Sequence, residues 1–193
     1  MKRLCVFCGS REGARPIYRV ATQQLGKLLG ERGIGLVYGG GRIGLMGLLA
    51  DAVLASGGEV IGVIPDFLAG PEVAHGGLTE LRVVHTMHER KAMMAELADG
   101  FIALPGGYGT LEEFFEILTW AQLGLHRKPC ALLNIGGYYD PLLRVVAHAL
   151  DEDFIRTRHR GLILDDADPA RLLDDMARYV PPGVEPILHT DQI

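Results

Sequence analysis

The residues that could do chemistry together gather in one short stretch, Leu104-Pro105-Gly106-Gly107-Tyr108-Gly109-Thr110-Leu111-Glu112-Glu113. Its three glycines let the backbone fold tightly and approach a ligand without Cβ atoms in the way. The apolar residues 101–104 predict a buried strand before the turn, and Thr110 stands where the N-cap of a following helix is expected. Free N–H groups and the positive end of the helix dipole would then point at one place. This arrangement is typical of a site for phosphate or another anion.

Glu113 has two interpretations in this setting. Thr110-x-x-Glu113 fits a capping box, in which the two side chains close the start of a helix on itself. Alternatively, Glu113 is a carboxylate held beside a bound sugar phosphate. The spacing alone favours the capping box, so other parts of the sequence must decide between them.

A second glycine-rich segment, Gly39-Gly40-Gly41-Arg42-Ile43-Gly44, follows the second predicted strand and opens a helix. Its G-x-G-x-x-G spacing is formally that of a dinucleotide-binding turn, and Asp66 lies near the position of a ribose-binding acid. A nicotinamide-dependent enzyme is therefore one alternative, and a tight turn without a ligand is another. The motif follows the second strand rather than the first, however, and another anion-binding turn follows the fifth. Two such turns and a basic helix fit a mononucleotide better.

Two basic residues, Arg90 and Lys91, lie near the start of a helix predicted from Met87 to Ala98. At about 100° per residue, both project into the apolar arc of that helix. A charged residue in such a place must snorkel, form an ion pair or bind a ligand. An arginine fork suits phosphate or carboxylate, and a lysine adds a point charge. We expect both to bind an anionic substrate and to keep Glu113 ionised.

These motifs resemble those of the Lonely guy proteins, the cytokinin-activating phosphoribohydrolases. Residues 105–113 match the family signature PGGxGTxxE, and residues 39–47 and Met87-His88-Glu89-Arg90-Lys91 look like its other two motifs, in the same order. The resemblance covers about residues 3 to 180. The signature is shared with a molybdenum-cofactor carrier and with purine nucleotide nucleosidases. The label lysine decarboxylase has also been attached to the family, but nothing in the sequence looks like a pyridoxal-phosphate enzyme.

The resemblance implies hydrolysis of the N-glycosidic bond of an N6-modified adenosine 5′-monophosphate, with AMP as a further candidate substrate. Glu113 and Arg90 would be catalytic, with no cofactor. Because bond cleavage builds positive charge on the ribose, Glu113 would stabilise that charge, orient the attacking water or hold a ribose hydroxyl. The alternatives are a non-catalytic nucleotide or molybdenum-cofactor carrier and a nicotinamide-dependent enzyme.

The expected substrate-binding residues come from the glycine-rich turns, the basic helix and neighbouring loops. They are Ser10, Gly39, Gly40, Gly41, Gly44, Glu72, Lys91, Gly106, Gly107, Tyr108, Gly109, Thr110 and Glu112. The position of Glu72 in this set rests on the resemblance alone, because its spacing indicates only a solvated loop acid.

Strands alternate with helices along the chain. The predicted strands are 3–8, 36–38, 59–64, 81–85, 101–104 and 130–134, and the predicted helices are 16–32, 45–56, 87–98, 110–123, 141–151 and 169–179. This pattern predicts an α/β fold: a single Rossmann-like doubly wound domain over residues 1–180, with a mainly parallel sheet flanked by helices, and a C-terminal tail over 181–193. Ligands of such sheets bind beyond the carboxyl ends of the strands. We therefore expect the loops at those ends to converge on one site.

Composition narrows the function classes. With 193 residues, 48% of them hydrophobic, the chain can form one domain with a full core. A formal charge of −5 argues against a general nucleic-acid binder. No apolar run is long enough for a membrane span, and Met1-Lys2-Arg3 leads into a strand rather than a signal peptide, which indicates a cytoplasmic protein.

The cysteines and histidines indicate neither a redox site nor a metal site. Cys5-x-x-Cys8 lies within a predicted strand and not at a helix N-terminus, so burial is expected. His75, His85 and His88 form no metal-ligand spacing with a cysteine or carboxylate cluster, and we predict no metal.

The helix predicted over residues 110–123 carries more apolar surface than one face of a sheet needs. The excess predicts a subunit interface, with core packing as the alternative. The resemblance likewise implies a homodimer whose active sites are shared across the interface.

Overall fold

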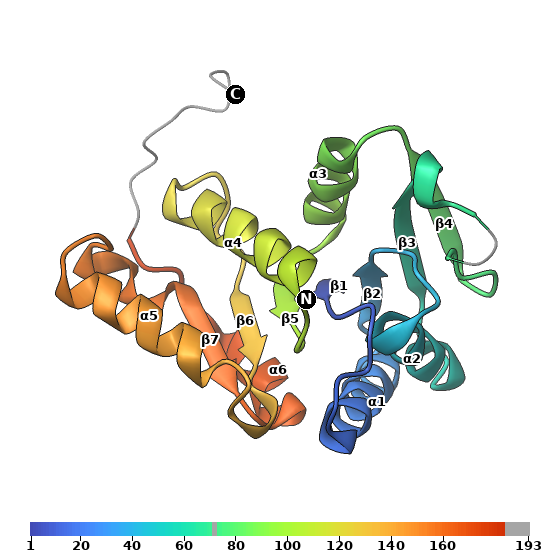
Figure 1. The fold of residues 1–193 in the computed structure, drawn as a ribbon, viewed down its shortest axis with the longest axis horizontal. Helices are drawn as coiled ribbons and strands as arrows, with labels where there is room; N and C mark the ends of the chain where they lie inside the picture. Colours follow the sequence, from blue (N-terminus) through green and yellow to red (C-terminus); the bar gives the residue numbers. More distant parts are fainter. Residues whose placement is uncertain (71–72, 184–193) are drawn as a thin grey trace.

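A computed structural model describes residues 1–70 and 73–183 of the chain. Helices cover both faces of a sheet whose described strands are all parallel, in the order β4-β3-β2-β1-β5-β6-β7 (Figure 1). The strands are β1 (Arg3–Phe7), β2 (Gly35–Tyr38), β3 (Val60–Pro65), β4 (Glu80–Val84), β5 (Phe101–Ala103), β6 (Cys130–Leu133) and β7 (Ile163–Asp166). The helices are α1 (Pro16–Glu31), α2 (Gly44–Ala55), α3 (Met87–Leu97), α4 (Tyr108–Gln122), α5 (Asp140–Asp151) and α6 (Pro169–Arg178), with short 3-10 turns η1 (Asp66–Leu68), η2 (Ile135–Gly137) and η3 (Thr157–Leu162).

The two faces of the sheet have separate cores. Leu4 and Val6 of β1 point into the core formed with α1, α2 and α6, whereas Cys5 and Phe7 point into the core formed with α3 and α4. This division follows from the two-residue period of a strand. The central strands are apolar on both faces because helices cover both of them.

The order of the strands reverses between β1 and β5. The chain moves outward from β1 through β2, β3 and β4, and then crosses back through α3 to β5 on the other side of β1. The two strands pair directly, with Phe7 opposite Ala103. A reversal of this kind is where α/β proteins bind ligands, beyond the carboxyl ends of the strands. Both glycine-rich segments of the sequence begin at that edge.

The predicted α/β, doubly wound, parallel fold is confirmed, and two details differ. The prediction missed β7, a short edge strand in which Ile163 and Leu164 are followed by two aspartates, so its apolar run is too brief to be recognised. Helix α4 begins at Tyr108 and not at Thr110. Residues 184–193 of the predicted tail lie outside the described residues.

The three cysteines are buried and free, as expected for core residues. Burial raises the pKa of the Cys130 thiol to about 12, and it raises the pKa of Cys5 and Cys8 further. Thiols of this kind pack as small hydrophobic groups. In the described ranges, no helix is both long and apolar enough to cross a membrane.

Candidate active site

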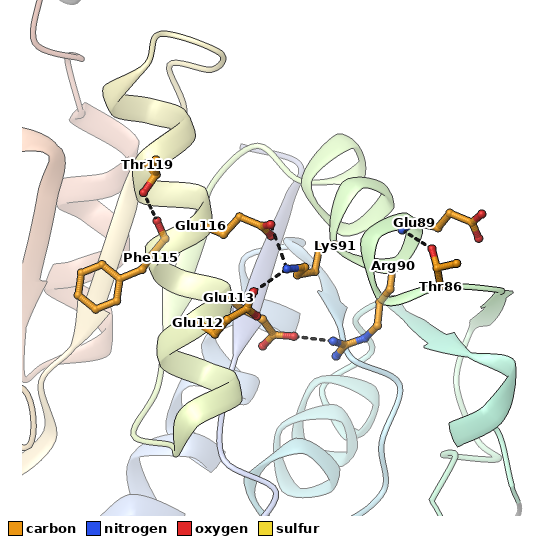
Figure 2. A network of polar contacts seen from close by, with 9 residues as sticks. All are labelled: Thr86, Glu89, Arg90, Lys91, Glu112, Glu113, Phe115, Glu116 and Thr119. Carbon is orange, nitrogen blue, oxygen red and sulfur yellow. Dashed lines mark hydrogen bonds and ion pairs between the residues drawn. The ribbon is translucent and has the colours of Figure 1, made fainter. Parts of the chain in front are cut away.

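Arg90 of α3 and Glu113 of α4 form a buried ion pair at the strand reversal (Figure 2). The Arg90 Nη1 atom lies 2.6 Å from Glu113 Oε1, and each side chain is 11% exposed. Arg90 Nε also donates a hydrogen bond to the carbonyl oxygen of Val63, 3.1 Å away within β3. The guanidinium group is therefore held between β3 and α4 and does not snorkel to solvent.

Bonds resembling a capping box, with Glu89 reaching the residue before the N-cap, fix the start of α3 and so the direction of Arg90. Thr86 is the N-cap, and its Oγ1 accepts a hydrogen bond from the backbone N–H of Glu89 at 3.1 Å. The Glu89 carboxylate in turn accepts one from the N–H of His85 at 2.8 Å. Reciprocal bonds of this type set the entry of the chain into a helix.

Gly39 leaves the space that the Arg90 side chain occupies. A Cβ atom at position 39 would collide with the Arg90 guanidinium. Glycine is therefore needed at position 39 because the Arg90 side chain approaches the backbone closely there. Whether Gly39 also contacts substrate stays a prediction.

The expectation that Thr110 caps α4, and with it the capping-box interpretation of Glu113, is wrong. The N-cap is Gly107, whose extended backbone lets the helix begin earlier, and no side chain caps it. Thr110 lies in the first turn, buried beside Gly106. The Glu113 carboxylate instead bonds to Arg90 from another helix.

Burial and charge act in opposite directions on Glu113. Burial raises the pKa of its carboxyl group above the usual value, while the charge and hydrogen bond of Arg90 lower it; burial has the larger effect. A buried carboxylate whose pKa is perturbed and that has a specific charged partner is a recognised feature of functional sites. Arg90 is the group that favours its ionised form.

Lys91 and Glu112, both expected to bind substrate, are bonded to each other. Lys91 Nζ lies 2.6 Å from Glu112 Oε1 and 3.0 Å from Glu116 Oε1 (Figure 2). Burial alone would lower the pKa of Lys91, but these two hydrogen bonds outweigh it, and the pKa is raised. Lys91 is therefore a stable cation that joins α3 to α4 beside the Arg90–Glu113 pair.

The turn after β5 borders a pocket of about 300 Å³. Its lining includes segment 9–13, Leu45, segment 105–107, Tyr18 and Tyr138. Ser10, Gly106 and Gly107, predicted to bind substrate, thus meet at one cavity. Tyr108 is 94% exposed and does not line it.

The second glycine-rich segment packs against the same loop. Gly44 begins α2, and a Cβ atom there would collide with the backbone of Ser10. The N–H of Leu45 donates to the carbonyl oxygen of Gly9 at 3.1 Å, and Gly41 forms an antiparallel bridge with Ala74. The segment therefore helps to shape the pocket. Glu72 lies outside the described residues.

Asp66, the acid of the dinucleotide-binding alternative, is engaged elsewhere. Its carboxylate accepts a hydrogen bond from the N–H of Phe67 and lies 3.1 Å from His85 Nδ1. The side chain is half exposed. This geometry gives the nicotinamide alternative no support.

Sequence reasoning missed the two tyrosines after β6. Tyr138 Oη donates to the carbonyl oxygen of Gly106, and Tyr139 Oη donates to that of Leu104. No local motif marks them, because their partners lie in another loop. Their position after the carboxyl end of a predicted strand was the one signal in the sequence that they belong near a ligand site.

Comparisons with known proteins agree with the sequence motifs. The family model described as "Possible lysine decarboxylase" matches residues 46–176. A cytokinin riboside 5′-monophosphate phosphoribohydrolase of Rhodococcoides fascians is 56% identical over 88% of this chain and 87% of its own. Phosphoribohydrolases of the same name from Arabidopsis thaliana and Oryza sativa subsp. japonica are 52% and 50% identical, covering 93% and 100% of this chain and 83% and 79% of theirs.

Solved structures share the fold at lower identity. The molybdenum cofactor binding protein of Rippkaea orientalis has a TM-score of 0.69 and 22% identity, covering 92% of this chain and 97% of its own. The molybdenum cofactor carrier protein of Chlamydomonas reinhardtii has a TM-score of 0.67 and 22% identity, covering 91% and 96%. At this identity, the likeness shows the fold alone.

Proposed function

This chain belongs to the family of cytokinin riboside 5′-monophosphate phosphoribohydrolases, and we propose that its Arg90–Glu113 pair carries out the hydrolysis that releases a free base and ribose 5-phosphate. The substrate is an N6-modified adenosine 5′-monophosphate, with AMP as the unmodified candidate. The observation that carries the proposal is the buried ion pair, 2.6 Å long, beside a glycine turn at the strand reversal.

Glu113 supplies negative charge where the ribose becomes positive. Cleavage of an N-glycosidic bond passes through a state resembling an oxocarbenium ion, which a nearby carboxylate stabilises. A desolvated carboxylate does this better than one in water, because the surrounding dielectric is low. The alternative roles for the same carboxylate are to hold a ribose hydroxyl or to orient the attacking water.

Arg90 keeps that carboxylate ionised and in place. Its two bonds, to Val63 and to Glu113, use separate nitrogens of one planar group. Fork geometry of this kind fixes direction as well as charge. In this proposal, other N–H groups of the guanidinium bind a substrate hydroxyl or phosphate.

The 5′-phosphate binds at the turn that starts α4. The helix begins at Gly107 without a capping side chain, so its first N–H groups and the dipole favour an anion. Ser10, Gly106 and Gly107 line the adjoining pocket. Thr110, Gly109 and Tyr108 belong to the first turn of the same helix. Glu72, Lys91 and Glu112 remain proposed substrate contacts. Lys91 and Glu112 would contact the substrate while they stay paired with each other.

The protein is proposed to act in the cytoplasm as a homodimer with shared active sites. Within the described chain, no residue of α5 is fully buried, although Leu142 and Leu143 pack against the core. Val145 and Phe154 are strongly exposed, and a largely apolar groove lies between α4 and η3, with Phe115 of α4 and Val146 of α5 in its lining. An apolar face of this kind is typical of subunit contacts.

Steady-state release of the base tests the proposal. Adenine should appear from AMP, and N6-isopentenyladenine from its 5′-monophosphate, each with one equivalent of ribose 5-phosphate. Tight binding of either nucleotide without release of base would favour a carrier. Activity that depends on added nicotinamide cofactor would contradict the hydrolase.

A further inference from the structure

Three successive carbonyl oxygens in the turn after β5 are each held by a donor from another part of the fold. Leu104 O accepts from Tyr139 Oη at 2.6 Å, and Pro105 O accepts from the N–H of Gly9 at 3.1 Å. Gly106 O accepts from Tyr138 Oη at 2.5 Å. Two of the three donors are therefore the neighbouring tyrosines that follow β6.

Holding a carbonyl oxygen also directs the next N–H group. In a planar trans peptide, the carbonyl of one residue and the N–H of the next point in opposite directions. The bond from Gly9 to Pro105 O thus sets the direction of the Gly106 N–H. The bond from Tyr138 to Gly106 O sets that of the Gly107 N–H in the same way.

This matters for an anion, because a flexible glycine turn can present either donors or carbonyl oxygens. Gly106 and Gly107 line the pocket, and α4 begins there without a capping side chain. Carbonyl oxygens facing the pocket would repel a phosphate, whereas N–H groups bind it. Donors that hold the carbonyls therefore determine which groups face the ligand.

Hydrogen bonds and two glycines fix the conformation of the segment after β6, which carries both tyrosines. The Asn134 side chain accepts a hydrogen bond from the N–H of Tyr139 at 2.7 Å and donates one to Asp140 Oδ1 at 2.8 Å. Gly136 and Gly137 have positive φ angles of 60° and 74°, which turn the chain sharply between β6 and α5.

The two rings are also fixed by packing. Tyr138 and Tyr139 meet edge to face with centroids 5.0 Å apart, and Tyr18 packs edge-on against Tyr138 at 5.9 Å. Tyr139 is fully buried, and burial raises the pKa of its hydroxyl, so it stays a proton donor. Tyr138 is partly exposed and forms part of the pocket wall.

We propose that Tyr138 is a positioning residue for the phosphate group, holding the Gly106 carbonyl so that the Gly107 N–H faces the pocket. Tyr139 supports it by holding Leu104 O, although the following residue, Pro105, has no N–H to direct. The inference rests on the proposed function for the identity of the ligand, a ribose 5-phosphate moiety. Neither hydroxyl needs to touch the substrate. Loss of the Tyr138 hydroxyl should weaken binding of the phosphate part and leave the base part unaffected.

The test compares Tyr138→Phe, Tyr139→Phe and Tyr179→Phe with the unmodified protein. All three changes keep the ring and remove one hydroxyl, and Tyr179 lies after α6 near Cys130, at the opposite end of the strands. Calorimetry would give the Kd of the two products, ribose 5-phosphate and adenine, and melting curves would be taken on the same samples. Kinetics on AMP would separate KM from kcat.

Tyr138→Phe should raise the Kd of ribose 5-phosphate by roughly three- to tenfold, the usual value of one hydrogen bond. The Kd of adenine should stay the same, KM should rise more than kcat falls, and Tyr179→Phe should match the unmodified protein. Tyr139→Phe should lower the melting temperature and change the Kd of ribose 5-phosphate less than Tyr138→Phe does, because Leu104 O precedes a proline that has no N–H. If it does not fold, Tyr138→Phe alone decides, because that residue is partly exposed.

Unchanged binding of ribose 5-phosphate by Tyr138→Phe would overturn the inference even if melting shifts, because the tyrosine would then be structural only. If the unmodified protein binds AMP but releases no base, the proposed function fails, and the binding comparison still decides the role of the tyrosines. Failure of the unmodified protein to bind any of the phosphate compounds would overturn both.

Discussion

At the scale of single residues, the ionisation of Glu113 makes activity depend on pH. Burial raises the pKa of Glu113 above the ordinary 4.5. As the pH falls, the carboxylate therefore takes up its proton earlier than an exposed glutamate would. Because only the ionised form stabilises positive charge on ribose, kcat/KM should fall on the acid side with a midpoint above 4.5.

A pH–rate profile from about pH 4 to 8 measures that midpoint. This range spans the titration of both the Glu113 carboxyl group and the substrate phosphate. The substrate phosphate also titrates near pH 6, which could produce a similar decline. The residual activity of a Glu113→Gln variant separates these two causes. The variant lacks the titration of Glu113 and keeps the titration of the substrate phosphate. An identical acid limb in both proteins would remove Glu113 as its source.

The activity should be sensitive even to replacement of Arg90 by another cation. Arg90→Lys keeps the charge but cannot bond to Val63 and Glu113 through two nitrogens of one plane. We expect a loss of kcat/KM of roughly tenfold or more, and a larger loss for Arg90→Ala. Arg171→Lys, at an exposed pair with Asp166, is the matched control and should be silent. Wild-type kinetics in Arg90→Lys would exclude a role for fork geometry.

At the scale of elements, Lys91 is expected to contribute stability by joining α3 to α4. Removing it in Lys91→Met leaves Glu112 and Glu116 close together without a cation. The free energy of unfolding should fall by about 1–2 kcal/mol, between the values typical of exposed and buried pairs. Denaturant unfolding measures this change.

Lys27→Met is the control, because Lys27 forms an exposed pair with Glu31 one helical turn away. Its loss should change stability by less than about 0.5 kcal/mol. Equal effects of the two changes would mean that the bridge between α3 and α4 adds nothing beyond an ordinary surface pair.

The same helices show what a sequence can and cannot predict. The apolar arc of α3 correctly predicted that Arg90 and Lys91 turn inward, because helical periodicity is a local property. The partner of Glu113 was not predictable in this way. Its local spacing with Thr110 suggested a capping box, but the contact that it makes comes from another helix. The glycine turn was recognised, yet the tyrosines that hold it belong to a distant loop.

At the scale of the whole molecule, the apolar face of α4 and α5 predicts a homodimer. Sedimentation at micromolar concentration should give about twice the chain mass. Phe154→Asp places a charge on the exposed face and should shift the equilibrium toward monomer. Val20→Asp, at an exposed position on α1 against the other face of the sheet, should leave the dimer intact.

Activity of the resulting monomer tests whether the sites are shared. If residues of one protomer complete the site of its partner, dilution or Phe154→Asp should lower kcat/KM together with the dimer fraction. A monomer with full activity would contradict shared sites.

The most direct test of the central claim is release of base by Glu113→Gln. The change removes the negative charge and keeps the size and hydrogen-bonding capacity of the side chain. If Glu113 stabilises charge on the ribose, kcat for release of N6-isopentenyladenine from its 5′-monophosphate should fall roughly a hundredfold or more, while the melting curve shows a folded protein. Near-normal turnover in a folded Glu113→Gln protein would contradict the account.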